Sequence, residues 1–264
     1  MILDFHMHAF PDALAARAMD KLASVSKLTA HTDGTVADTC EKLQRWGIDK
    51  GLLLPIATKP SQQTGINDWA ARVQAQEPQL FAFGSVHPDA PDALTELERI
   101  HTLGLKGIKL HPDYQEFYAD EERLFPIYEH CAKLGLIVVF HAGRDPVSPE
   151  QVHAAPAALR RVLDTFPTLT MVLAHMGGMH VWHEVETHLV GQAVYFDTAF
   201  VAGEISDTQM LRLIRRHGTD KILFASDCPW SSPVSEIDLL NRLPLTDSEK
   251  EQIFWSNAKG LLRF

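Results

Sequence analysis

The feature that most constrains the fold is a regular alternation of short apolar runs with amphipathic stretches. Apolar runs that look like β-strands lie at 1–6, 51–57, 80–86, 105–111, 136–142, 169–175, 193–199 and 221–227. Helical patterns lie between them at 35–46, 66–76, 92–100, 123–134, 155–166 and 207–217. Near-continuous apolar strands separated by helices are typical of a parallel sheet that helices cover. The alternation therefore predicts an α/β protein.

The number of these units indicates which α/β fold to expect. Eight of them in 264 residues match the (β/α)₈ TIM barrel. The alternative is a doubly wound open sheet, which usually carries a glycine-rich turn after its first strand, where this chain has His-Met-His-Ala-Phe-Pro. No composition break marks a boundary, so we expect one domain over residues 1–264. The stretch 246–264 predicts an additional C-terminal helix on the outside of the barrel.

The charge balance limits the expected partners. The chain has 24 Lys and Arg residues against 34 Asp and Glu residues, a net charge of −10 at pH 7. Nucleic acid and anionic membranes both need a basic face, so we expect neither as a partner. A small-molecule substrate is expected instead, and self-association into a homo-oligomer stays open. The three cysteines are far apart, and no leader-like or membrane-length apolar run occurs, which favours a cytoplasmic protein.

Histidines and carboxylates gather at the predicted C-terminal ends of the strands, where such barrels hold their chemistry. His6 and His8 are two residues apart on the first strand, so both project from one face. The other polar residues at strand ends are His87, Lys109, His111, His141, His175, Asp197 and Asp227. Six of the 14 histidines thus lie on this rim, and imidazoles with carboxylates suit Zn²⁺ and similar ions. The pattern predicts His6 and His8 as ligands of a metal over the barrel mouth.

Seven ordered segments carry a resemblance to a known family. They are DFHMH, GIKLHP, VVFHAG, LAHMGG, VYFDTA, FASDCPW and IFWSNAKGLL, and they span almost the whole chain. In this order they resemble the amidohydrolase superfamily, and more narrowly its amidohydrolase-2 branch, which includes aminocarboxymuconate-semialdehyde decarboxylase. His-x-His alone is a weak signal, but seven motifs on the expected strands are specific.

The resemblance implies a metal site and two catalytic residues. By position, the metal ligands are His6, His8, His141 and Asp227, and His175 is either a further ligand or a partner of the reacting water. Asp227 is also expected to take the proton of that water, and His175 to stabilise the developing oxyanion. The implied cofactor is a divalent metal ion, with Zn²⁺ expected.

Four further rim residues are candidates for binding the substrate. Arg144 has a planar guanidinium that pairs with a carboxylate, although a surface salt bridge is the alternative. Asp197 either binds substrate or braces a neighbouring imidazole. His111, like His87, precedes a proline, so it either lines the pocket or only ends its strand.

Lys109 is the fourth candidate, and three interpretations of it stay open. It pairs with a carboxylate such as Asp227 or Asp197, its ammonium binds an anionic substrate, or it is carbamylated and bridges two metals, as the resemblance to binuclear amidohydrolases implies. An unpaired buried ammonium is costly, so a lysine in a barrel mouth calls for an explanation. We expect one principal metal with Lys109 as an unmodified cation that faces the substrate.

Taken together, these residues predict a metal-dependent hydrolase that attacks an amide, ester or lactone carbonyl of a small anionic substrate. Two alternatives remain at this point. The same site in related enzymes removes CO₂ from unsaturated or aromatic carboxylic acids, and a barrel that binds metal without catalysis is the third interpretation. The short chain, with few insertions between strands, favours hydrolysis.

Overall fold

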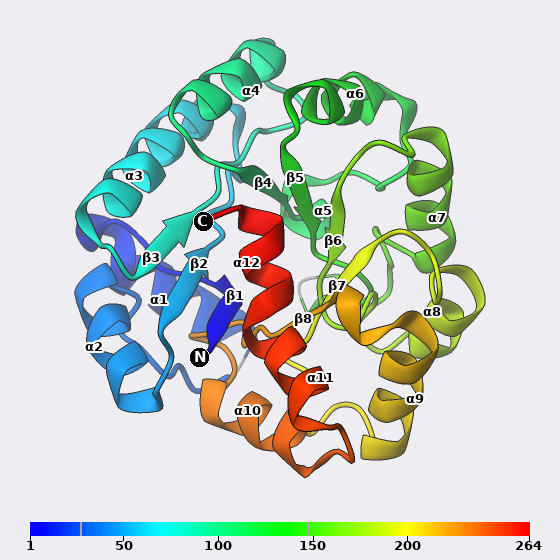
Figure 1. The fold of residues 1–264 in the computed structure, drawn as a ribbon. Helices are drawn as coiled ribbons and strands as arrows, with labels where there is room; N and C mark the ends of the chain where they lie inside the picture. The colour runs from blue at the N-terminus through cyan, green and yellow to red at the C-terminus, as the bar shows by residue number, and fades with distance from the viewer. Residues whose placement is uncertain (27, 147) are drawn as a thin grey trace.

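A closed ring of parallel strands forms the centre of the molecule. The computed structural model describes residues 1–26, 28–146 and 148–264. The strands are β1 (Leu3–Met7), β2 (Lys50–Leu53), β3 (Leu80–Ala82), β4 (Gly107–Leu110), β5 (Ile137–Phe140), β6 (Met171–Leu173), β7 (Tyr195–Asp197) and β8 (Ile222–Leu223). They pair in chain order as two sheets, β1–β3 and β4–β8. Parallel bridges from Gly84 to Ile108 and from Met7 to Cys228 join the sheet edges, so the predicted (β/α)₈ barrel is confirmed (Figure 1).

Helices surround this ring (Figure 1), six of them where the amphipathic patterns predict helices and two, at 182–188 and 233–242, where no pattern was identified. They are α2 (Val36–Trp46), α3 (Gln63–Gln76), α4 (Ala93–Thr102), α6 (Phe125–Leu134), α7 (Pro156–Thr165), α8 (Trp182–His188), α9 (Asp207–His217) and α10 (Pro233–Arg242). Local signals set several of their ends: the Thr35 side chain accepts a hydrogen bond from Asp38 N at the start of α2, and Gly47 ends that helix in a left-handed conformation.

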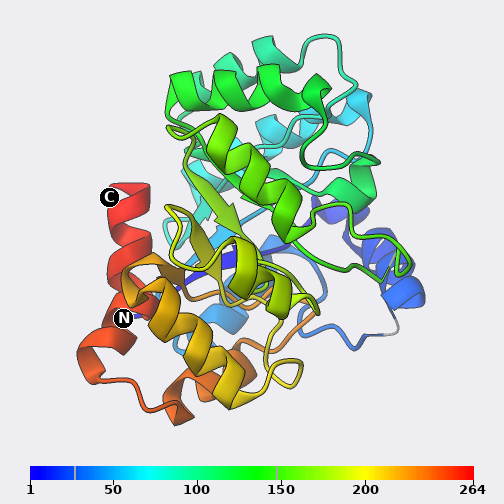
Figure 2. The same cartoon turned by 90° about the vertical axis from the view of Figure 1, so that its right-hand side faces the viewer.

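Two helices lie in the connections after β1 and β4, in addition to the surrounding ring. They are α1 (Asp12–Ser26) and α5 (Pro112–Gln115). Neither is among the predicted helices, although α1 has the alanine-rich composition of a good helix former. α1 lies at the end of the barrel opposite to the chain's C-terminal helices (Figure 2). It therefore contributes to the barrel mouth rather than to the wall.

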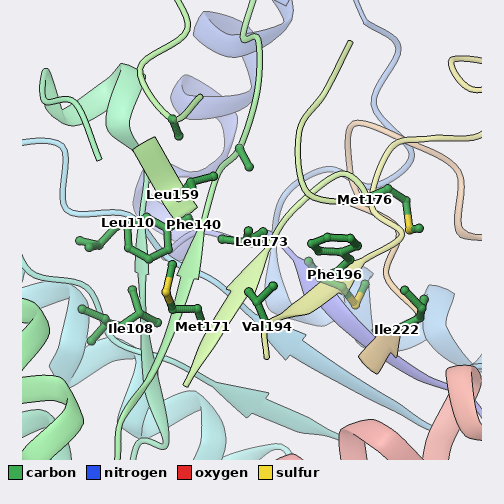
Figure 3. Close-up of a cluster of buried hydrophobic side chains, with 14 of the residues drawn as sticks. Ile108, Leu110, Phe140, Leu159, Met171, Leu173, Met176, Val194, Phe196 and Ile222 are labelled. Atoms are coloured by element: carbon green, nitrogen blue, oxygen red, sulfur yellow. The ribbon is translucent and has the colours of Figure 1, made fainter. Parts of the chain in front are cut away.

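Alternation along the strands divides the core into two layers. Ile108, Leu110 and Phe140 point outward and pack with residues of the surrounding helices, such as Leu159 (Figure 3). Val139 points inward and packs with Leu3, Phe5 and other residues inside the barrel. Because side chains on a strand alternate, the inward positions of β4 and β5 lead upward to Lys109, His111 and His141 at the mouth.

The C-terminal helices close the bottom of the barrel, which corrects the prediction that they pack on its outside. The segments are α11 (Asp247–Glu251), a π-helical stretch (Gln252–Ser256) and α12 (Asn257–Leu262). Trp255, Ala258 and Leu262 belong to the same buried cluster as the barrel interior, and α12 crosses the open end of the ring (Figure 1). The interior apolar residues need a cover at this end, and the helix supplies it.

Most observed strands are shorter than the apolar runs from which they were predicted. The run 221–227, for example, contains only the two-residue strand β8. The residues beyond the strand leave the extended conformation to form the mouth, as Asp227 does with a left-handed φ of 66°. No helix within the described residues is both long and apolar enough to span a membrane.

The cover at the bottom of the barrel leads to a prediction about stability. We expect Leu262→Ala to lower the free energy of unfolding by about 2–5 kcal/mol, because it leaves a cavity against the barrel interior. Lys259→Ala on the same helix is the matched control, because Lys259 is exposed, and it should change the free energy by no more than about 0.5 kcal/mol. Urea denaturation followed by circular dichroism measures both, and equal effects would show that α12 is not part of the core.

Candidate metal centre

Three side chains from the first and last strands converge at the mouth of the barrel. His6 Nε2 lies 3.2 Å from His8 Nε2, and Asp227 Oδ1 lies 3.3 Å from the former and 3.0 Å from the latter. Among the described residues, these three form one of two groups whose ligand atoms lie within 4.8 Å of one another. His6 and His8 thus meet as their spacing predicts, and Asp227 joins them because the barrel closes between β8 and β1.

The hydrogen bonds of the two imidazoles decide which of their nitrogens carries a proton. His8 Nδ1 lies 3.0 Å from the carbonyl oxygen of Leu54, which can only accept, so this nitrogen is the donor. His6 Nδ1 donates in the same way to Asp197 Oδ2 at 2.9 Å. In the neutral rings both Nε2 atoms therefore carry lone pairs that face each other and a carboxylate oxygen. Burial and then the charge of Lys109 lower the pKa of His6 well below its usual value, which keeps its ring neutral.

This arrangement fits a divalent cation. Two imidazole lone pairs and a carboxylate at mutual distances near 3 Å repel one another unless a positive charge lies among them. Burial would raise the pKa of Asp227, but the neighbouring His6, His8 and His175 lower it to about 2, so the carboxylate is ionised. Neutral imidazoles and an ionised carboxylate are the forms in which these groups bind metals.

Two buried carboxylates hold the ligand-bearing strands in position. Asp4 accepts hydrogen bonds from the backbone of His6 at 3.1 Å and of Ser226 at 3.0 Å, and so joins the ends of β1 and β8. Asp197 accepts the His6 ring with one oxygen and the backbone N–H groups of His175 and Ala199 with the other.

The role of each carboxylate follows from this geometry. Of the two roles expected for Asp197, the geometry favours bracing an imidazole, because the side chain is fully buried and does not line the cavity. Asp4 was not predicted, although a carboxylate inside an apolar strand was a usable signal.

A shift in strand register turns His6 into the mouth. Leu3 and Phe5 point into the barrel interior, whereas Met7 packs in the outer layer, and the pairing of β1 with β2 shifts between Asp4 and Met7. The shift lets His6 face the cavity directly after the inward-pointing Phe5. Irregularities of this kind often re-aim a side chain beside an active site.

His141 and His175 form a second pair next to the first three side chains. His175 Nδ1 lies 2.8 Å from the carbonyl oxygen of Ala199 and donates to it, so its Nε2 is an acceptor 3.1 Å from His141 Nδ1. The rings of His175 and His6 are 5.7 Å apart. Both predicted residues thus line the same cavity as His6 and His8, but neither belongs to the compact group of ligand atoms.

His141 also belongs to a second cluster, together with His111 and Asp145. The rings of His111 and His141 are stacked, 4.3 Å apart and 11° from parallel. A ring nitrogen binds a metal in the plane of its ring, and two nearly parallel stacked planes offer no common point for an ion. We therefore interpret this cluster as a support for His141 rather than as a second metal site.

Asp113 completes the support behind His141, and no sequence signal identified it or Asp145. His141 Nε2 and Asp113 Oδ2 are buried without hydrogen-bond partners and lie 3.8 Å apart. The other oxygen of Asp113 accepts His153 Nδ1 at 2.8 Å. A small rotation of His141 would make the missing bond, and carboxylates commonly orient metal-binding imidazoles in this way. His153 is therefore also part of this support.

Lys109 is buried in the mouth, with an exposed fraction of 1%. Its Nζ lies 3.3 Å from His6 Nε2. Burial lowers the pKa of Lys109 to about 8, although the charges of Asp197, Asp227 and Asp145 act in the opposite direction. Lys109 lines the cavity, and its role as an unmodified cation that faces the substrate stays a prediction.

The mouth encloses a cavity of about 740 Å³. His111 and Arg144 line it, as two of the expected substrate-binding residues should. Arg144 is exposed, and its Nη1 donates to the carbonyl oxygen of Pro149 at 3.0 Å. His87 does not line the cavity, and its Nδ1 accepts the backbone N–H of Asp89 instead.

Comparison with known proteins identifies relatives that are similar in sequence to this chain. The chain is 22% identical over 244 residues to gamma-resorcylate decarboxylase of Polaromonas sp. (strain JS666 / ATCC BAA-500), covering 75% of this chain and 74% of the relative. It is 25% identical over 235 residues to 2-amino-3-carboxymuconate-6-semialdehyde decarboxylase of Dictyostelium discoideum, covering 75% of this chain and 65% of the relative.

Solved structures share the fold over their whole length. A 2,6-dihydroxybenzoate decarboxylase in complex with 2,6-dihydroxybenzoate superposes with a TM-score of 0.77 at 18% identity, covering 100% of this chain and 99% of the other. A dihydroxybenzoic acid decarboxylase of Polaromonas sp. JS666, with bound manganese and the inhibitor 2-nitroresorcinol, gives a TM-score of 0.73 at 16% identity, covering 99% and 96%.

These comparisons correct the prediction of carbonyl hydrolysis, since the relatives named above are decarboxylases. They agree with the alternative of decarboxylation and with the use of a divalent metal. The family profile described as Amidohydrolase matches residues 3–264. The chain belongs to the amidohydrolase family, as its ordered histidine and aspartate motifs predict.

Proposed function

We propose that this protein is a metal-dependent, non-oxidative decarboxylase of a small aromatic or unsaturated carboxylic acid. The observation that carries the proposal is the convergence of His6, His8 and Asp227 in a mouth that also contains the cations Lys109 and Arg144. The decarboxylase relatives, each matching about three quarters of the chain, support the choice of reaction.

The reaction breaks one C–C bond and forms one C–H bond. The C–C bond between the substrate and its carboxylate breaks, and CO₂ leaves. The electron pair of that bond stays on the substrate carbon, which then binds a proton. A divalent ion held by His6, His8 and Asp227, with His141 and His175 beside it, would polarise a substrate oxygen. We propose Zn²⁺ for this ion because nitrogen ligands predominate, and Mn²⁺ is the alternative to be tested.

The protein's own residues would bind the substrate and move the proton. Lys109 and Arg144 both line the cavity and offer positive charge to the departing carboxylate. Asp227 and His175 lie at the ends of β8 and β6 with left-handed backbone conformations, at φ values of 66° and 59°. Such conformations are uncommon for residues other than glycine and often occur at functional sites. We assign to these two side chains the relay of a proton from solvent to the substrate carbon, in which the ionised Asp227 first accepts the proton and then passes it on.

The proposed reaction is tested by assaying protein freed of metal and then reconstituted. We expect reconstitution with Zn²⁺ or Mn²⁺ to give CO₂ release from one or more members of a panel of hydroxybenzoates and muconic acids, and a chelator to abolish it. In D₂O the product should carry one deuterium at the carbon that lost CO₂. Hydrolysis of lactones or amides in the parallel assay, with no CO₂ from any acid, would contradict the proposal, as would a complete lack of turnover.

The ligand assignment predicts that a His6→Ala/His8→Ala variant loses its metal. Removing two of the three converging ligands should reduce bound metal from about one equivalent to a small fraction, as measured by elemental analysis. His183→Ala, on the exposed surface of α8, is the matched control and should retain the metal. A double variant that folds normally and retains a full equivalent would exclude these residues as ligands.

The role of Asp227 predicts a large loss of turnover in Asp227→Asn. Asparagine tolerates the left-handed backbone, so the fold should persist, while the charge and the proton-carrying oxygen are lost. Loss of general acid–base catalysis typically lowers kcat by about 10²–10⁴-fold. The measurement is kcat with the metal content determined on the same sample. A variant that holds metal and keeps nearly normal kcat would assign the proton transfer to another group.

A further inference from the structure

The cavity at the barrel mouth has two chemically different walls. One wall carries the metal-binding histidines, Lys109 and Asp227, as described above. The other wall is largely apolar, with Lys21 as its cation, and comes from the segment after β1, from α1, from the segment after β2 and from α3. Its main residues are Phe10, Ala18, Leu22, Ile56, Ile66 and Trp69. The proposed chemistry uses only the polar wall, so the apolar wall needs an explanation of its own.

Helix α1 shows how this wall is built. The helix has a broad apolar stripe, and one edge of it, at Ala15 and Met19, is buried in the protein. The other edge, at Ala18, Leu22 and Val25, lies on successive turns and lines the cavity. Val25 remains 48% exposed. Within the described residues, this edge therefore faces a space that a ligand can enter.

The acidic residues of α1 are kept away from that space. Asp12 and Asp20 belong to the same helix but do not line the cavity. The connections after β4, β5 and β8 supply the carboxylates that do line it, which are Asp113, Glu116, Asp145 and Asp227. The negative charge of the lining therefore comes from these connections, and α1 contributes a cation, Lys21, beside its apolar residues.

The size of the cavity points in the same direction. Its volume of about 740 Å³ lies in the upper half of the range of roughly 300–1,000 Å³ that holds drug-sized ligands. A single-ring acid with its carboxylate at Lys109 fills only part of such a space.

We infer that the wall formed by α1, Ile56, Ile66 and Trp69 is a subsite for an apolar substituent of the substrate. The substrate class is then an aromatic or unsaturated carboxylic acid that carries an alkyl or aryl group. This inference rests on the proposed decarboxylase function for the identity of the acid, but the subsite itself is a binding property. Burial of each additional methylene corresponds to about a fourfold gain in affinity.

The test measures binding, so that it does not depend on turnover. Zn²⁺-loaded protein is titrated calorimetrically with benzoate and with the 3- and 4-isomers of ethylbenzoate and butylbenzoate. We expect the better butyl isomer to bind about fifteenfold more tightly than its ethyl counterpart, with a more negative heat-capacity change. Affinities that do not rise along either series would overturn the inference.

A matched set of variants locates the effect. Leu22→Ser/Val25→Ser should remove most of the gain from the alkyl chain and leave benzoate affinity within about twofold. Leu14→Ser is the control, because Leu14 lies on the same helix, is 53% exposed and does not line the cavity. Ile66→Thr on α3 should weaken butylbenzoate independently of α1. If Leu14→Ser and the double variant change the affinity for butylbenzoate equally, the apolar wall is not the surface that binds the alkyl group.

The two proposals fail separately. Alkyl-dependent binding without CO₂ release from any alkyl-substituted hydroxybenzoate would support the subsite and contradict the decarboxylase. CO₂ release from unsubstituted hydroxybenzoates, with no preference for alkyl groups, would support the decarboxylase and contradict the subsite.

Discussion

The site depends on one electrostatic constraint, the close approach of His6 Nε2, His8 Nε2 and Asp227 Oδ1. Three electron-rich atoms lie 3.0–3.3 Å apart, and the hydrogen bonds to Asp197 and to Leu54 O fix the protons on the far side of both rings. Lys109 Nζ lies 3.3 Å from one of these atoms, His6 Nε2, and a metal ion among all three would offset their repulsion. The braces provided by Asp4 and Asp197 are therefore best understood as the means by which the fold keeps these atoms together until a metal binds.

Barrel closure makes that approach available to residues 219 positions apart in the chain. Phe5 N donates to Phe224 O, His8 N donates to Cys228 O, and Asp227 N donates to His6 O. These bonds join the first and last strands at the level of the site. The C-terminal helix fills the opposite end of the same interior, so the packing that stabilises the barrel and the geometry of the ligands share the strands β1 and β8.

The sequence predicts the barrel and its rim because both follow from periodicity. Apolar runs identified all eight strands, and the strand-end rule brought His6, His8, His141, His175 and Asp227 to one cavity. The alternation of side chains could not reveal the register shift in β1 that aims His6. The supporting residues Asp113 and Asp145 also escaped prediction, since their positions depend on how loops fold over the mouth.

The position of the C-terminal helix on the barrel and the reaction type were predicted wrongly for a related physical reason. An apolar helical face predicts that the helix is buried, but it does not identify the surface against which the helix packs. Here that surface is the open bottom of the barrel. In the same way, a metal site built from imidazoles and a carboxylate suits hydrolysis and decarboxylation equally well. What distinguishes the two reactions is the shape and charge of the cavity around the site. That cavity depends on connections such as α1, and these are the segments that strand and helix periodicity describes least.

The chain leaves β1 at Met7 and enters α1 at Asp12, so the strand that supplies two metal ligands continues within a few residues into the apolar wall. Reaction centre and wall are therefore held by a short stretch of one segment, which couples the position of the metal to the shape of the ligand that the cavity accepts.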